Sequence, residues 1–170
     1  RLNVPLLFID RDSFNYFDLQ IQMRKLAWHK IAHNNWVGDY PYTPEAAFQI
    51  AHSGQHIFLH FAVSEKYVKA QYVRPNEAVW EDSCVEFFIS FDGRQSYYNM
   101  EFNVLGTGLI GYGPQVKAQR ARQSAESIAQ VRTASSIVNT AQEKNWSMIW
   151  EIPITVFKEQ PLHDLSGMAA

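Results

Sequence analysis

The sequence predicts an all-β protein, an antiparallel β-sandwich of jelly-roll type with a few short helical segments. Short runs of residues have apolar side chains at alternate positions, as in Ile57, Leu59, Phe61 and Val63. Turn-forming residues such as Asp92-Gly93 separate these runs, and convincing helical periodicity is scarce. Many short strands with turns between them are typical of sandwiches and barrels.

Length and composition set the limits of this fold. The 170 residues predict one domain over 1–170, with 46% hydrophobic and 19% charged residues, which is a globular profile. No apolar run reaches the roughly 18 residues of a membrane span. The net charge is −2, so we expect no nucleic-acid partner. The nearest basic cluster, Lys117, Arg120 and Arg122, is interpreted as solvated loop charge.

The first half of the chain contains one expected helix and one expected hairpin. Leu19, Met23 and Leu26 recur at helical spacing and predict a helix within residues 18–31. Residues 47–51 and 56–63 predict two strands, because both alternate and the turn residues 53–55 lie between them.

The second half supplies the clearest strands, at residues 85–89 and 97–104, with Asp92-Gly93 between them as a hairpin signal. We expect residues 109–112 to pair back onto this hairpin. Residues 114–130 are interpreted as a long excursion. Residues 135–138 and 146–152 predict two later strands. The single cysteine, Cys84, excludes an intramolecular disulfide and is interpreted as a buried, inert thiol.

The predicted hairpin at 85–104 has one apolar and one polar face. Side chains alternate between the faces of a strand, so burying both apolar sets together places Glu86 on the same surface as Asn99, Glu101 and Asn103. A two-residue turn at Asp92-Gly93 would put Glu86 opposite Asn99. A turn at Gly93-Arg94 would put Glu86 opposite Glu101.

Two carboxylates and two carboxamides on one sheet face admit two explanations. Solvent-facing sheet surfaces normally carry polar residues, so the pattern fits an ordinary amphipathic strand. Like charges facing each other across strands are unfavourable, however, and these groups are well suited to accept and donate hydrogen bonds to sugar hydroxyls. Trp80, just before the strand, would then stack on the apolar face of a sugar ring.

The run Val79–Ile89, followed by Tyr97–Asn103 and Gly106, resembles the core signature of carbohydrate-binding module family 9 and its bacterial relatives. Weaker similarities extend the resemblance over residues 36–157. It implies an antiparallel β-sandwich that binds sugars and accompanies glycan-degrading enzymes in carbohydrate catabolism. We therefore expect a carbohydrate ligand, and a glycan-degrading enzyme as a partner.

The resemblance also implies the site residues. Trp80 matches the first tryptophan of the motif, Glu86 the polar position six residues later, and Glu101 and Asn103 the polar positions of the next strand. In the family a positively charged residue can stand where this chain has Glu101, so the ligand can differ.

Two features of the family have weaker counterparts here. A second tryptophan, from near the C-terminus of the family domain, completes the sugar clamp, and Trp36 or Trp146 could substitute for it. Family members often bind structural calcium, for which Asp82 and Asp92 could supply oxygen ligands.

Three other functions compete with sugar binding. Glu86 and Glu101 could form the carboxylate pair of a glycoside hydrolase. Related sandwiches carry haem, for which His60 and Met100 are candidate axial ligands. An interaction domain could also retain the fold and bind no sugar. We predict a non-catalytic sugar-binding domain that contacts its ligand through Trp80, Glu86, Asn99, Glu101, Asn103 and Trp36.

Overall fold

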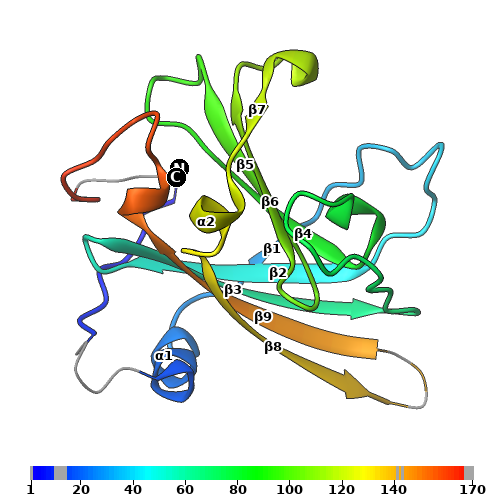
Figure 1. Cartoon of the computed structure of the whole chain (residues 1–170). Helices are drawn as coiled ribbons and strands as arrows, with labels where there is room; N and C mark the ends of the chain where they lie inside the picture. The colour runs from blue at the N-terminus through cyan, green and yellow to red at the C-terminus, as the bar shows by residue number, and fades with distance from the viewer. Residues whose placement is uncertain (1, 10–14, 141, 143, 167–170) are drawn as a thin grey trace.

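Two antiparallel sheets face each other across a shared apolar core in the computed structural model, which describes residues 2–9, 15–140, 142 and 144–166 (Figure 1). The five-stranded sheet has the order β1 (His29–Lys30), β2 (Glu45–His52), β3 (His56–Glu65), β9 (Lys144–Pro153) and β8 (Arg132–Asn139). The four-stranded sheet has the order β4 (Cys84–Ile89), β5 (Tyr97–Asn103), β6 (Gly108–Gly113) and β7 (Ala121–Arg122). The predicted all-β sandwich is confirmed.

The helical segments are short. They are α1 (Tyr16–Met23), α2 (Ala125–Ile128), and the single 3₁₀ turns η1 (Val79–Glu81), η2 (Lys117–Gln119) and η3 (Ile154–Val156). Residues 114–130, predicted as one long excursion, therefore contain η2, the edge strand β7 and α2. No described helix has the length and apolar character needed to cross a membrane.

The core forms where alternate side chains of the two sheets meet. Trp150 of β9 lies at its centre and is fully buried. Its ring centroid is 5.1 Å from that of Phe61 on β3 and 4.7 Å from that of Phe102 on β5. One side chain thus contacts aromatic partners from both sheets, and its burial favours their close packing.

Helix α1 covers part of the outer face of the five-stranded sheet (Figure 1). Leu19 and Met23 pack there against Phe58 of β3 and Ile149 of β9. The helix predicted within 18–31 ends at Met23. The prediction was therefore wrong for residues 24–31. Leu26 is partly buried against the same cluster but lies in a turn, which explains the helical spacing without a longer helix. The chain then forms β1, which pairs with β2.

Candidate functional site

The hairpin of β4 and β5 pairs Glu86 directly with Glu101. This is the register expected from a turn at Gly93-Arg94. Gly93 and Arg94 have φ values of +70° and +72°, as a two-residue turn of the I′ type requires. The other face of the hairpin packs into the core, as predicted. Its buried side chains are Val85, Ile89, Met100 and Phe102, and Phe87 packs against them.

Asp92 stabilises this turn. Its carboxylate accepts hydrogen bonds from the backbone N–H groups of Gln95 and Ser96 and from the hydroxyls of Ser90 and Ser96. These bonds, above all those from Ser96, lower the pKa of Asp92 to about 2. The turn therefore fixes the register that brings the two glutamates together.

Asn99 and Glu101 form the buried floor of the polar face. Asn99 Nδ2 donates to Glu101 Oε1 at 2.6 Å, and both side chains are 8% exposed. Their other oxygens, Asn99 Oδ1 and Glu101 Oε2, are buried and have no hydrogen-bond partner among the described residues. An unsatisfied buried polar atom costs roughly 1–3 kcal/mol. A sugar hydroxyl that reached these oxygens after a shift of the side chains covering them would supply the missing bonds.

The electrostatics of this floor favour a neutral Glu101. Burial, and then the neighbouring Glu86 carboxylate, raise the pKa of Glu101 to about 7, although Lys117, the bond from Asn99 and Arg122 act in the opposite direction. Desolvation also raises the pKa of Glu86, against the attraction of Lys117 and Arg120. Near neutral pH, Glu101 therefore exchanges between a carboxylate and a carboxylic acid that can donate a hydrogen bond.

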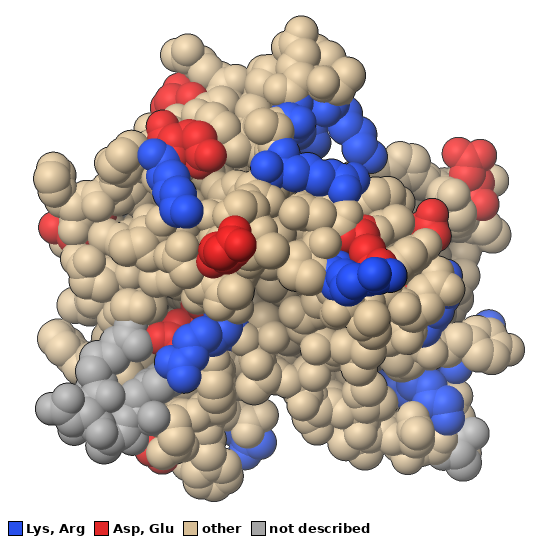
Figure 2. Space-filling view, viewed as in Figure 1, with Lys and Arg blue, Asp and Glu red and all other residues tan. Residues whose placement is uncertain are grey.

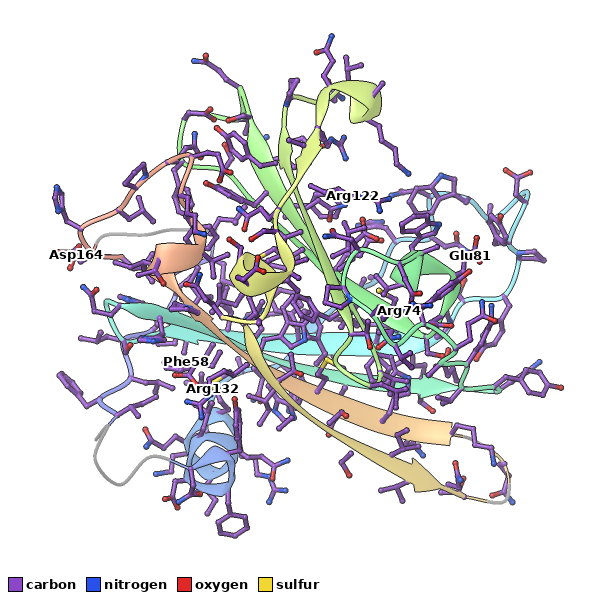
Figure 3. All side chains as sticks on the ribbon, viewed as in Figure 1. Phe58, Arg74, Glu81, Arg122, Arg132 and Asp164 are labelled. Carbon is purple, nitrogen blue, oxygen red and sulfur yellow. The ribbon has the colours of Figure 1, made fainter. Side chains whose placement is uncertain are left out.

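Trp80 lies on η1, where the preceding Val79 is fully buried, and two cations that act on Glu101 also lie over its ring. The indole is 42% exposed. Lys117 Nζ lies 5.4 Å and the Arg122 guanidinium carbon 5.7 Å from the ring centroid. Figure 3 shows Arg122 on the same side of the molecule as Glu81, the neighbour of Trp80. The indole proposed as a platform is thus partly accessible and flanked by positive charge.

The cations around Trp80 were not identified as site residues from the sequence, which suggested a solvated loop. Lys117 and Arg122 are exposed, but they contact the tryptophan, and Arg122 pairs with Gly111 on β6. Figure 2 shows Lys and Arg side chains gathered on the part of the surface that bears η2 and β7. The two-residue length of β7 gives almost no alternation, so its pairing left no readable signal.

A second aromatic group borders the same face and was also missed. Phe88 is exposed on β4, two residues beyond Glu86, and its ring centroid is 5.6 Å from that of Tyr97. The Arg120 guanidinium lies 4.5 Å above the Tyr97 ring. An exposed Phe at a polar-face position was the signal that could have identified this border.

Asn103 has a different role from the predicted ligand contact. It is fully buried, and Nδ2 donates to the carbonyl of Tyr72 and to Asp82 Oδ2. Its Oδ1 accepts from the backbone N–H groups of Leu105 and Thr107. All its hydrogen-bonding capacity is used within the protein. We therefore assign Asn103 to holding segment 66–83, which carries η1, against the sheet.

The two acids predicted as calcium ligands also have protein partners. Asp82 accepts from the backbone N–H groups of Gln71 and Tyr72 and from Asn103. Asp92 holds the hairpin turn as described above. The part of the chain that the structure describes contains no group of three or more His, Cys, Asp or Glu side chains suited to a metal ion. These residues do not fit a calcium site, because N–H and O–H donors already engage their oxygens.

The candidates for a second clamp tryptophan have different environments. Trp146 is buried in the core and donates from Nε1 to Glu65 Oε1, which rules it out as a sugar clamp. Trp36 is 67% exposed in the loop between β1 and β2. This loop reaches segment 66–83, because Tyr42 of the loop accepts a hydrogen bond from the Lys66 N–H. A ligand contact by Trp36 stays a prediction.

The candidate haem ligands are not brought together. His60 lies on the outer face of β3, bonded to Gln49 and 5.0 Å from the ring of Trp28, and burial lowers its pKa to about 4. Met100 is fully buried in the core between the sheets. The two side chains lie on different sides of the five-stranded sheet. They therefore cannot ligate one iron.

A groove of about 540 Å³ lies on the outer face of the five-stranded sheet, away from Trp80. Four small side chains in register across the strands line it: Ala47, Ala62, Ser147 and Ser136. Trp28, 44% exposed, also borders the groove. No sequence motif marks this hollow. Because it lies on the other sheet, it serves as a control surface for the Trp80 face.

Comparisons with known proteins agree with the fold and the motif. The family model described as carbohydrate-binding family 9 matches residues 15–170. A crystal structure from Bacteroides uniformis, described as a candidate carbohydrate-binding protein, is 33% identical, with a TM-score of 0.84 over 96% of this chain and 77% of that chain. No curated protein matches the chain. The match extends beyond the predicted 36–157 at both ends, and the chain belongs to carbohydrate-binding family 9.

Proposed function

We propose that the chain binds a carbohydrate, without transforming it, on the outer face of the four-stranded sheet. Trp80 would stack on a sugar ring, and Glu86, Asn99 and Glu101 would bind its hydroxyls. The observation that carries the proposal is that Asn99 Oδ1 and Glu101 Oε2 are buried without a partner among the described residues, while cations that act on Glu101 lie over the exposed ring of Trp80. Stacking platforms combined with a few convergent polar groups are typical of small-molecule sites.

The proposal extends to a biological role. Through the resemblance to modules that accompany glycan-degrading enzymes, we propose that the chain serves carbohydrate catabolism by holding a glycan near such an enzyme. Family membership and the related Bacteroides uniformis structure support a carbohydrate ligand.

The test is calorimetric titration of the chain with a panel of mono- and oligosaccharides, repeated for Trp80→Ala and Trp28→Ala. The two tryptophans are almost equally exposed, at 42% and 44%, and stand at different surfaces. Loss of a stacked aromatic should weaken binding by about tenfold or more in Trp80→Ala, while Trp28→Ala should bind like the parent.

Each alternative outcome has a definite meaning. If Trp28→Ala loses binding and Trp80→Ala keeps it, the sugar occupies the groove on the five-stranded sheet and the site assignment is wrong. If no sugar binds the parent chain, the domain has retained the fold for another interaction. Chromogenic glycosides added to the same samples should stay intact, and turnover that is lost in Glu86→Gln would favour a hydrolase instead.

A further inference from the structure

We propose that this site prefers a sugar bearing an anionic group, a carboxylate or a sulfate. The inference rests on the proposed function, because it names the class of sugar bound on the same face. Three cationic side chains, Lys117, Arg120 and Arg122, surround a floor that has two carboxyl groups, Glu86 and Glu101.

In the part of the chain that the structure describes, the salt bridges involve other residues than these three cations. Within the described residues, none of them forms a salt bridge to Glu86 or Glu101. Lys117 Nζ instead lies over the Trp80 ring. A positive charge that faces an aromatic platform is available to a ligand that stacks there.

The two arginines are positioned by neutral groups. Arg120 donates from Nε to the Pro114 carbonyl at 3.0 Å and from Nη2 to the Gln115 carbonyl at 2.7 Å. Arg122 donates from Nη1 to the Asn76 carbonyl at 2.5 Å. Carbonyls fix the guanidinium groups without cancelling their charge, and each guanidinium has five N–H donors, so some remain for a ligand. This planar array suits carboxylate and sulfate oxygens.

The sheet surface leaves room between the cations and the floor. Asn99 pairs with Gly111, and Gly111 pairs with Arg122, so the three form one row across β5, β6 and β7. A Cβ atom added to Gly111 would have no neighbour within 4 Å. The missing side chain therefore leaves open space between the buried amide of Asn99 and the strand that carries Arg122.

The charge balance of the site favours an anion. When Glu101 is protonated, Glu86 is the remaining carboxylate of the floor, and three cations act on this floor: Lys117, Arg120 and Arg122. The site then has a surplus of positive charge within a few ångströms of a stacking platform. Such complementarity selects among ligands of otherwise similar shape.

The experiment compares matched pairs of sugars at low ionic strength. Glucuronate is titrated against glucose and galacturonate against galactose, with glucose 6-sulfate as a separate arm to distinguish the two anionic groups. We expect at least one acidic sugar to bind roughly tenfold more tightly than its neutral partner, as one charge-assisted hydrogen bond would give. Added salt should narrow the difference, because mobile ions screen exposed charges.

Variants assign the preference to the site. Lys117→Gln should reduce the ratio of acidic to neutral affinity severalfold, and Lys117→Arg should restore it. Lys25→Gln removes a lysine that is also exposed, just after α1, and should leave the ratio unchanged. Equal affinity for acidic and neutral sugars would overturn the inference while leaving the proposed function intact. Binding of neither class would overturn both.

Discussion

Glu101 is a buried carboxyl group whose charge the fold tolerates poorly. Its pKa is about 7, against an ordinary value of 4.5. The unfolded chain therefore releases this proton at lower pH than the folded chain, and the native state loses stability relative to the unfolded state as pH rises from about 4.5 to above 7. The difference between the two pKa values corresponds to about 3 kcal/mol.

Glu101→Gln should remove this pH dependence. The free energy of unfolding of the parent chain, measured by denaturant titration from pH 4 to pH 8, should fall by about 3 kcal/mol relative to that of the variant. Ser135→Ala on the other sheet serves as a neutral control. Parallel curves for the parent and Glu101→Gln would show that Glu101 titrates normally in the folded state.

The two asparagines of β5 have opposite roles at the same sheet face. Asn99 Oδ1 has no partner among the residues that the structure describes, whereas the side chain of Asn103 satisfies every donor and acceptor within the chain. The sequence could not separate them, because Tyr72 and Asp82, the partners of the Asn103 amide, are 31 and 21 residues away. Alternation places a side chain on a face, but it does not show what covers that face.

At the scale of the element, the β4–β5 turn determines whether the site forms. Gly93 has φ +70°, and a Cβ atom there would meet no neighbour within 4 Å, so the backbone conformation alone selects glycine. Gly93→Ala should lower the free energy of unfolding by about 1 kcal/mol, because side chains disfavour left-handed backbone. Urea titration of the variant measures this change.

Gly38→Ala is the matched control for Gly93→Ala. Gly38 also has open space around it but lacks a positive φ, so alanine there should be neutral or slightly stabilising. If both variants lose the same stability, the left-handed conformation of Gly93 is not the reason for glycine in this turn.

The strands of the hairpin could be predicted because their signals are local. The alternation of apolar side chains located β4 and β5 within one residue at each end. Burying the apolar side chains of both strands together placed Glu86 opposite Glu101 or Asn99. The choice between these registers required the backbone angles of Gly93 and Arg94, which the sequence does not specify. The positive border of the site could not be predicted, because it depends on β6 pairing with a two-residue strand.

At the scale of the whole molecule, the sheets depend on a few aromatic contacts between them. Trp150 is fully buried and contacts Phe61 and Phe102 on opposite sheets. Trp150→Ala should lower the free energy of unfolding by about 3–5 kcal/mol, because it leaves a large cavity in the core. The exposed Trp36 is the control, and Trp36→Ala should change stability by less than about 0.5 kcal/mol.

Denaturant midpoints of the two tryptophan variants would test this view of the core. A loss in Trp150→Ala no larger than that in Trp36→Ala would mean that the sheets are joined elsewhere. The measured stabilities also serve the binding studies, because affinities of variants should be compared at equal fractions of folded protein.

Asn103 and Glu101 lie two residues apart on β5 but bond to different parts of the molecule. The amide of Asn103 bonds to Tyr72 and Asp82 in the segment that carries Trp80, whereas Glu101 accepts its hydrogen bond from Asn99 on its own strand. Substitution of Glu101 should therefore change the polar face while leaving the bonds of Asn103 to that segment in place. If the chain binds a sugar as proposed, substitutions at Glu101 can change the preferred ligand while the bonds of Asn103 keep the Trp80 segment in place.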